Sequence, residues 1–333
     1  MLQPRQLGLQ LHPTVTLIFL LTGILMVQPK TRWILLSRYC AVIWLGFVLA
    51  GCAIGRAKVI HNPPQAAPLQ TEKLQHHPVI AIALGGAATR SFAHVGVLNA
   101  LQRNGIEPDI VVGTSAGSVV GVLYAGGIRG EQLEAAALKL QRVQVVDMTW
   151  SGRGLIRGES LQRYINRYLG NRPIEQLQTV FAATATELSE GKLVVFTRGN
   201  AGVAVRASSA FPGLIRPVKI DGHDYVDGGL ISKVPVRVAR QLGVDIVIAV
   251  DVSRPPIDHE PLDSTFAVMD QAVTIMQQEV VDQELSQADV VIRPELGVMS
   301  ITDFDMRQDA IDAGEKAALA AVGKIKELIA KKQ

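Results

Sequence analysis

The sequence predicts an α/β fold of three layers, with a mostly parallel central sheet and helices on both of its faces. Short apolar runs of strand length recur along the chain, and they are continuous rather than alternating. Continuous apolar runs are typical of strands that are buried on both faces. Helical patterns separate these runs, as they do where crossover helices join parallel strands. The expected strands are residues 79–84, 109–112, 192–197, 245–253 and 289–294.

The expected helices lie between these strands and at the end of the chain. The first helical pattern stops at Gly105, and the last carries lysines near its end, where the helix dipole favours positive charge. No linker composition interrupts residues 78–333, which are therefore predicted to form one domain. The helical patterns cover residues 92–105, 115–124, 232–242, 264–287 and 306–332.

Charge is distributed unevenly along the 333 residues, of which 48% are hydrophobic. The net charge is +3, but residues 1–51 contain four basic and no acidic residues. Residues 52–333 therefore carry a net charge of −1. A nearly neutral body lacks the basic face that a nucleic-acid partner requires, so no nucleic-acid binding is expected.

The N-terminal region has the pattern of a secretory signal. Basic residues precede the apolar run "CAVIWLGFVLAGC", which ends at Cys52. Residues 49–52, "LAGC", resemble a bacterial lipobox, which implies cleavage before Cys52 and a diacylglycerol on its sulfur. A membrane-spanning segment that ends in a cysteine is the alternative. Residues 1–51 are thus assigned to targeting, with Met26 as a possible true start.

A proline-containing polar segment follows, and residues 52–77 are expected to tether the domain to the membrane. Because Ala53 rather than aspartate follows Cys52, the resemblance to lipoprotein sorting signals favours the outer membrane. Both cysteines, Cys40 and Cys52, precede the domain, so neither a disulfide scaffold nor a thiolate metal site is expected in it.

"GTSAGS", residues 113–118, follows a predicted buried strand and opens a predicted helix. In a Gly-x-Ser-x-Gly turn, glycines such as Gly113 and Gly117 remove side chains that would collide, and the serine hydroxyl projects above the sheet. The helix directs its positive end toward the site. Ser115 is therefore a candidate nucleophile. A glycine turn that only packs a helix closely on a strand is the alternative.

A nucleophilic serine needs a base, and two kinds of candidate are present. If the catalytic residues follow the chain order of an α/β-hydrolase, which is serine, acid and then histidine, the histidine available as the base is His259, in a proline-rich loop. His94 is expected to pack on a helix, and His223 to be exposed in a hairpin. The second kind of candidate is Asp227, whose carboxylate the following Gly228 and Gly229 allow to approach another element closely.

Four blocks in order resemble the patatin-like phospholipases, especially their bacterial branch. They are "ALGGAATRSFAHVGVL" (83–98), "GTSAGS" (113–118), "ASSAFPGLIRPV" (207–218) and "DGG" (227–229). The resemblance implies a Ser–Asp dyad of Ser115 and Asp227 that forms an acyl-serine without a catalytic histidine. It also implies that Arg90 steadies the glycine loop, whose backbone N–H groups form an oxyanion hole. These groups belong to Gly85, Gly86, Ala87 and Ala88.

The glycine loop departs from the family pattern at Ala87, where a third glycine is usual, and at Ser91, where a glycine usually follows the arginine. If position 87 required a positive φ, alanine there would cost about 1 kcal/mol and misdirect a donor. A non-catalytic lipoprotein that binds a lipid or a partner in the same cleft is therefore one alternative. An α/β-hydrolase esterase that uses His259 is another.

The expected substrate is a phospholipid or lysophospholipid. No acidic cluster has the spacing of a calcium loop, so a calcium-independent mechanism with no metal and no cofactor is expected. Residues 143–158 place Met148, Trp150 and Leu155 among glycines, and they form either an apolar flap over an acyl chain or an ordinary packed loop.

Overall fold

The computed structural model describes residues 62–68, 74, 78–149, 152–256, 265–297, 299–300 and 303–333. Every described residue belongs to one compact unit, Ile60–Gln333. The predicted signal region, Cys52, Trp150 and His259 lie outside the described residues.

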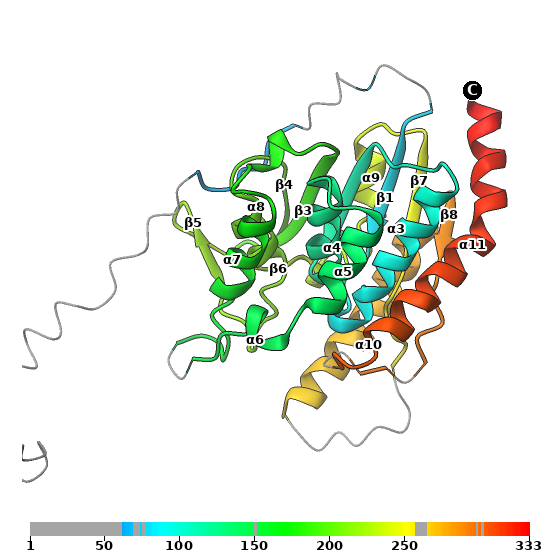
Figure 1. Cartoon of the computed structure of the whole chain (residues 1–333). Coiled ribbons are helices and arrows are strands. Elements are labelled where there is room, and N and C mark those ends of the chain that lie inside the picture. The colour runs from blue at the N-terminus through cyan, green and yellow to red at the C-terminus, as the bar shows by residue number, and fades with distance from the viewer. Residues whose placement is uncertain are drawn as a thin grey trace, which may run out of the picture. The chain divides into compact units, whose positions relative to one another are not determined.

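The described residues form an eight-stranded sheet in the order β5-β6-β3-β2-β1-β7-β8, with β4 paired to β3 (Figure 1). Strands β1, β2, β3, β7 and β8 are parallel, whereas β4, β5 and β6 pair antiparallel with their neighbours. The predicted fold class is confirmed. The strands are β1 (Ile80–Leu84), β2 (Ile110–Thr114), β3 (Val180–Glu187), β4 (Lys192–Phe196), β5 (Val218–Ile220), β6 (His223–Asp227), β7 (Ile246–Val250) and β8 (Val290–Ile292).

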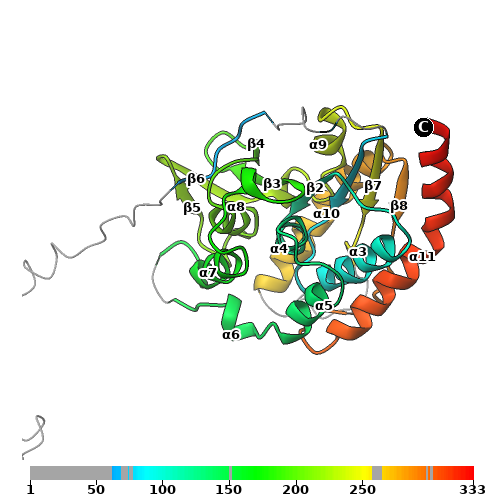
Figure 2. The same cartoon turned by 45° about the horizontal axis from the view of Figure 1, so that its top comes forward.

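Helices cover both faces of this sheet, and α11 runs beside α3 in both views (Figures 1 and 2). The helices are α3 (Ala93–Arg103), α4 (Ala116–Ala125), α5 (Gly130–Lys139), α6 (Arg142–Val145), α7 (Glu159–Tyr168), α8 (Ala201–Ser208), α9 (Val236–Gln241), α10 (Thr265–Leu285) and α11 (Arg307–Lys332). Three short 3-10 helices are η3 (Ala88–Phe92), η4 (Ile174–Gln176) and η5 (Gly228–Leu230). Among the described residues, no helix is both long and apolar enough to cross a membrane.

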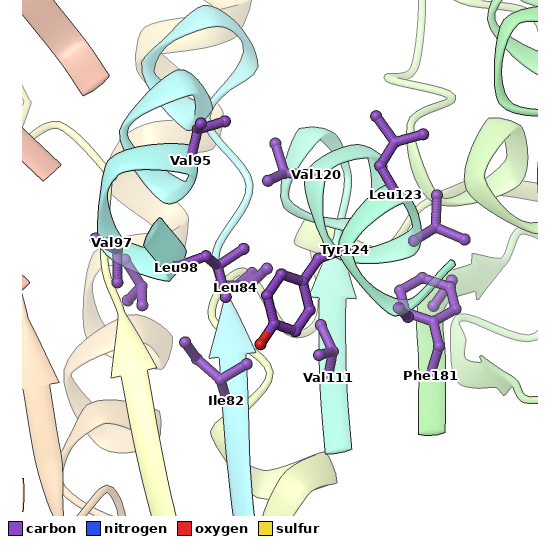
Figure 3. Close-up of a cluster of buried hydrophobic side chains, with 14 of the residues drawn as sticks. Ile82, Leu84, Val95, Val97, Leu98, Val111, Val120, Leu123, Tyr124 and Phe181 are labelled. Carbon is purple, nitrogen blue, oxygen red and sulfur yellow. The ribbon is translucent and has the colours of Figure 1, made fainter. Parts of the chain in front are cut away.

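The core consists of two apolar layers, one on each face of the sheet. Along β1, Ile82 and Leu84 pack against the layer of α3, α4 and α11, and Ala81 and Ala83 face α9 and α10. Figure 3 shows Leu84 close to Tyr124 of α4 in the first layer. All four β1 residues are fully buried, which explains why the strand reads as a continuous apolar run.

The pairing of β2 and β6 with β3 brings the ends of these two strands together. β2 pairs with the first part of β3 and ends with Thr114 opposite Thr184. β6 pairs antiparallel with the remaining residues of β3 and ends with Asp227 opposite Ala185. Because β4 overlaps both of these registers, it must occupy the opposite edge of β3. The carboxyl ends of β2 and β6 therefore meet end to end along one edge of β3.

Part of the predicted tether is folded onto the domain. Backbone N–H groups of Gln65 and Thr197 donate to the carbonyls of Arg198 and Gln65, each at 3.0 Å, and Asn200 N–H donates to Asn62 at 2.8 Å. This corrects the expectation that residues 52–77 are tether throughout. The segment has no apolar period because it binds through its backbone, in the manner of an added strand.

Candidate active site

Ser115 is held in a strained backbone conformation between β2 and α4. Its φ is 51° and its ψ is −128°, a region that residues with a Cβ rarely adopt. Ser115 is also the N-cap of α4, so the hydroxyl stands at the positive end of a ten-residue helix. The predicted strand–turn–helix context of the Gly-x-Ser-x-Gly motif is present.

Close backbone contacts explain the two glycines of this turn. A Cβ on Gly113 would lie 2.5 Å from the Cα of Ser118, and a Cβ on Gly117 would lie 2.3 Å from the carbonyl oxygen of Leu84. Real Cβ atoms do not approach backbone so closely. Both positions therefore need glycine for space, and neither has a positive φ.

Asp227 lies beside the serine because β6 ends against the end of β2. The hydroxyl of Ser115 donates to Oδ2 of Asp227 at 2.6 Å, and the N–H of Gly229 donates to Oδ1 at 2.7 Å. A Cβ on Gly228 would lie 2.4 Å from the hydroxyl oxygen of Thr184, so a glycine lets the chain turn against β3. Both carboxylate oxygens are thereby oriented.

The carboxyl group of Asp227 is only 5% exposed. Burial raises its pKa from 3.8 to about 6, against the opposing effects of the Ser115 hydroxyl, the Gly229 N–H and the charge of Lys233. A carboxylate with a raised pKa is a better proton acceptor and is still ionised at neutral pH. The pair can therefore transfer a proton from serine to aspartate.

A buried polar network fixes the strand ends beneath the pair. The hydroxyl of Thr114 donates to the carbonyl of Ser232 at 2.9 Å and lies 2.6 Å from the hydroxyl of Thr184. The hydroxyl of Ser232 donates in turn to Glu284 of α10 at 2.7 Å. This network ties β2, β3, α10 and the segment after Asp227 together. The sequence analysis identified none of these residues.

Ser208 is a further site residue that the sequence analysis did not single out, although it lies in the block 207–218. Its hydroxyl oxygen accepts the backbone N–H of Ser115 at 2.8 Å, and its side chain is fully buried at the end of α8. The N–H of the nucleophile is therefore occupied.

Two of the four predicted oxyanion donors are used elsewhere. The N–H of Gly85 donates to the carbonyl of Val250 and the N–H of Gly86 to that of Lys233, each at 3.0 Å. The N–H of Gly85 continues the pairing of β1 with β7, and the N–H of Gly86 bonds to the segment between η5 and α9. The assignment of Gly85 and Gly86 as donors is therefore wrong.

Gly86 instead brings the loop close to the nucleophile, since a Cβ there would lie 2.8 Å from the Cβ of Ser115. The N–H of Ala87 donates to the hydroxyl of Ser91 at 3.3 Å. Among the described residues, none accepts the N–H of Ala88 or of Ala116, which follows the nucleophile. These two N–H groups are the ones available to an oxyanion.

The positive φ in this loop is at Ala88, one residue after the position considered from the sequence. Ala87 has a φ of −160°, an extended conformation that alanine adopts freely, whereas Ala88 has a φ of 47°. The departure from glycine at position 87 is therefore not a steric problem.

Arg90 holds the glycine loop in place through hydrogen bonds to four backbone carbonyls. It is 5% exposed, and its guanidinium donates to the carbonyls of Val252 at 2.9 Å, Met299 at 3.2 Å, Gly297 at 3.3 Å and Ser253 at 3.4 Å. Burial and the nearby charge of Arg254 lower its pKa. These contacts join the loop to the segments that follow β7 and β8.

Neither described histidine of the domain touches the pair. His94 is fully buried and its Nε2 lies 2.7 Å from the carbonyl of Gly85; burial lowers its pKa to about 4. His223 begins β6, four residues and about 13 Å of extended strand before Asp227, and its exposed ring lies 3.5 Å from Glu187. Within the described ranges, no group of three or more His, Cys, Asp or Glu residues is placed to hold a metal ion.

The flap region packs against the loop after α8. Backbone N–H groups of Leu155 and Ile156 both donate to the carbonyl of Leu214 at 2.9 Å. Met148 and Leu155 are about half exposed, at 55% and 49%, while Ile156 is buried. The backbone of this segment is therefore held by hydrogen bonds, while two of its apolar side chains are exposed.

Comparisons with known proteins agree with this geometry. Residues 82–240 match the family model described as patatin-like phospholipase. An uncharacterized NTE family protein of Mycobacterium bovis is 36% identical over 190 residues, which cover 55% of this chain and 53% of the relative. A lysophospholipase of Coccidioides immitis is 33% identical over 180 residues, which cover 52% of this chain and 11% of that protein.

The chain thus spans about half the length of the mycobacterial relative that it matches. Among solved structures, VipD from Legionella pneumophila superposes with a TM-score of 0.50 and 12% identity, over 83% of this chain and 72% of that chain. At this identity the similarity concerns the fold alone, and it agrees with a mostly parallel sheet covered by helices on both faces.

Proposed function

Because the chain belongs to the patatin-like phospholipase family, we propose that it hydrolyses carboxylic esters of phospholipids or lysophospholipids. The observation that carries this proposal is the 2.6 Å hydrogen bond from the strained Ser115 to the buried Asp227. The lysophospholipase among its relatives supports a lipid ester as the substrate.

In the first step, Asp227 Oδ2 takes the hydroxyl proton of Ser115 while Oγ attacks the ester carbonyl. Collapse of the tetrahedral intermediate breaks the bond to the alcohol, which leaves with the proton from Asp227. A water molecule then gives its proton to Asp227 and attacks the acyl-serine, which releases the fatty acid and restores the serine.

The oxyanion is stabilised by the backbone N–H groups of Ala88 and Ala116. An N–H of the residue after the nucleophile together with one from a neighbouring loop is a common arrangement in serine hydrolases. Removing one such donor costs about 3–4 kcal/mol of transition-state stabilisation. The positive end of α4 adds to the same field.

Exposed apolar side chains near the site suit an acyl chain. Met269 of α10 lies against Gly213, where a Cβ would be 3.0 Å from the methionine Cε. Leu214 is the residue after Gly213, and the loop that packs on it carries the exposed side chains of Met148 and Leu155. Apolar groups from two separate elements therefore flank the loop that follows α8.

The membrane anchor is a second part of the proposal and rests on the sequence. The "LAGC" motif supports diacylglycerol on Cys52, and Ala53 supports retention in an outer membrane. Metabolic labelling with a palmitate analogue tests it. We expect incorporation that is lost in Cys52→Ser, and incorporation that persists in this variant would contradict the anchor.

The activity is tested by labelling the full-length chain with a fluorophosphonate probe and measuring fatty-acid release from a lysophospholipid. Ser115→Ala should abolish both, and Asp227→Ala should reduce both by about 10²–10⁴-fold. His259→Ala serves as the control and should leave both unchanged. Activity that survives in Asp227→Ala but is lost in His259→Ala would instead indicate a histidine-dependent esterase. A folded chain that does not label would indicate a non-catalytic binding role.

A further inference from the structure

A cavity of about 430 Å³ opens at the carboxyl ends of β7 and β8. Its walls come from the segments after these strands, from the segment after η5 and from α10. In sheets of parallel strands, ligands bind outside the carboxyl ends of the strands. The cavity therefore has the position of a ligand site.

Four basic side chains line this cavity. Arg90, Lys233, Arg254 and Arg293 line it, with only two acidic side chains, Asp251 and Asp282. Arg293 lies against both acids, 3.0 Å from Asp251 and 3.9 Å from Asp282. The lining thus carries two more positive than negative charges, which favours an anionic ligand.

Two of these cations are placed close together. Burial and the nearby charge of Arg254 lower the pKa of Arg90, and the charge of Asp251 opposes them; the Arg90 guanidinium itself donates only to uncharged carbonyls. Like charges in a partly desolvated site repel, and an anion between them removes this repulsion. Guanidinium groups bind phosphate with two parallel hydrogen bonds.

The cavity shares a wall with the catalytic site. Burial raises the pKa of Asp227, and the nearby charge of Lys233 opposes this rise; the carbonyl of Lys233 accepts the N–H of Gly86 at 3.0 Å. Gln277, also in the lining, donates to the carbonyl of Gly229. Lys233 and Gln277 therefore belong both to the cavity wall and to the surroundings of the catalytic aspartate.

We infer that this cavity binds the phosphate group of the lipid substrate while Ser115 attacks its acyl ester, an inference that rests on the proposed function. β1 separates β2 from β7, so the strand ends that carry the serine and the cavity lie about 10 Å apart. In a glycerophospholipid the acyl ester and the phosphate are held a few bonds apart on one glycerol. With its ester carbonyl at Ser115, such a substrate extends its phosphate toward the β7 wall of the cavity.

The test compares two substrates that differ only in the phosphate, 1-lauroyl-lysophosphatidic acid and 1-lauroylglycerol, in detergent micelles with the full-length chain. We expect Arg254→Gln and Lys233→Gln each to lower the ratio of the two kcat/KM values about tenfold, mainly through KM for the phosphate ester. Loss of Lys233 also changes Asp227, but this affects both substrates and cancels in the ratio.

Arg103→Gln is the matched control, because Arg103 is an exposed arginine on α3 paired with Glu315. The ratio should be the same in this variant as in the wild type. A ratio that also stays unchanged in Arg254→Gln and Lys233→Gln, with both substrates hydrolysed, would overturn the inference. If the wild type hydrolyses neither substrate and does not label, the proposed function fails instead.

Calorimetric titration with sn-glycerol 3-phosphate then tests the cavity independently of activity. We expect binding to the wild type and at least tenfold weaker binding to Arg254→Glu; equal binding would overturn the inference. Inorganic phosphate distinguishes a substrate headgroup from a free effector. It should raise KM for the lysophosphatidic acid, and phosphate that binds without raising this KM would assign the cavity to a free ion and contradict a headgroup site.

Discussion

The hydroxyl oxygen of Ser208 accepts the backbone N–H of Ser115 at 2.8 Å, from the end of a helix 93 residues further along the chain. The nucleophile has positive φ, and this bond is one of the contacts that hold it there. Asp227 is tied to the same region, since its N–H donates to the carbonyl of Ala210 at 3.0 Å. The segment after α8 therefore positions both members of the pair.

Ser208→Ala should leave the Ser115 N–H buried without its partner. We expect a loss of about 1–3 kcal/mol in the free energy of unfolding and a fall in kcat, because the elbow relaxes. Denaturant unfolding and kcat are the measurements. Ser208→Cys, which keeps a weak acceptor, should restore part of the activity. A Ser208→Ala enzyme with unchanged kcat would contradict a positioning role.

The activity should depend on the ionisation of Asp227. The group accepts a proton only as the carboxylate, and its pKa is about 6. The kcat/KM for a neutral ester is therefore expected to be constant above pH 7 and to fall about tenfold per pH unit well below pH 6. A profile with its midpoint near pH 4 would show that burial does not raise the pKa of this carboxyl.

Asp227→Asn should remove activity yet stabilise the folded chain at high pH. A pKa raised from 3.8 to about 6 means that the folded state binds the proton more tightly than the unfolded state. The stability from this group is present below pH 4 and is lost as pH rises through 6, by about 3 kcal/mol. The asparagine avoids this loss.

We therefore expect Asp227→Asn to be more stable than the wild type by about 1–3 kcal/mol at pH 8 and equal to it near pH 4, measured by urea unfolding. A variant that is less stable than the wild type at pH 8 would contradict the prediction.

The strain at Ala88 can be measured against its neighbour. Ala88→Gly relieves a positive φ, whereas Ala87→Gly only adds freedom to the unfolded chain. Relative to each other, the two variants should differ in unfolding free energy by about 1–2 kcal/mol, with Ala88→Gly the more stable. Equal stabilities would mean that the φ values of the two residues do not differ in this way.

Arg90→Lys should weaken the loop although it keeps the charge. A lysine cannot reach four carbonyls at once, so buried acceptors after β7 and β8 lose their donors. We expect a loss of about 2–3 kcal/mol in thermal unfolding experiments and a lower kcat. Arg103→Lys, at an exposed pair, should change neither. A fully stable Arg90→Lys would show that these contacts are dispensable.

Local sequence patterns were sufficient for strands that are buried on both faces and for the long helix α11. β1, β7 and α11 were predicted to within a few residues, because burial on both faces or a long helical period leaves a continuous signal. β3 was missed. Its inner residues are small, in "VFAATATE", since α4 and α8 pack closely on it, and small residues give little hydrophobic signal. β4 was predicted, but its antiparallel pairing to β3 was not.

The sequence by itself determined the fold class and made Ser115 a candidate nucleophile and Asp227 a candidate base, because glycines at fixed spacing reveal where backbone must approach backbone. That the two form a pair was implied by the resemblance of four sequence blocks to the patatin-like phospholipases. Only the tertiary structure decided which N–H groups remain for an oxyanion. Gly85 and Gly86 give theirs to Val250 and Lys233, residues far away in the chain. The contacts of Ser208 and Arg90 were decided in the same way. A hydrogen-bond partner depends on which strand ends meet, and no local pattern contains that information.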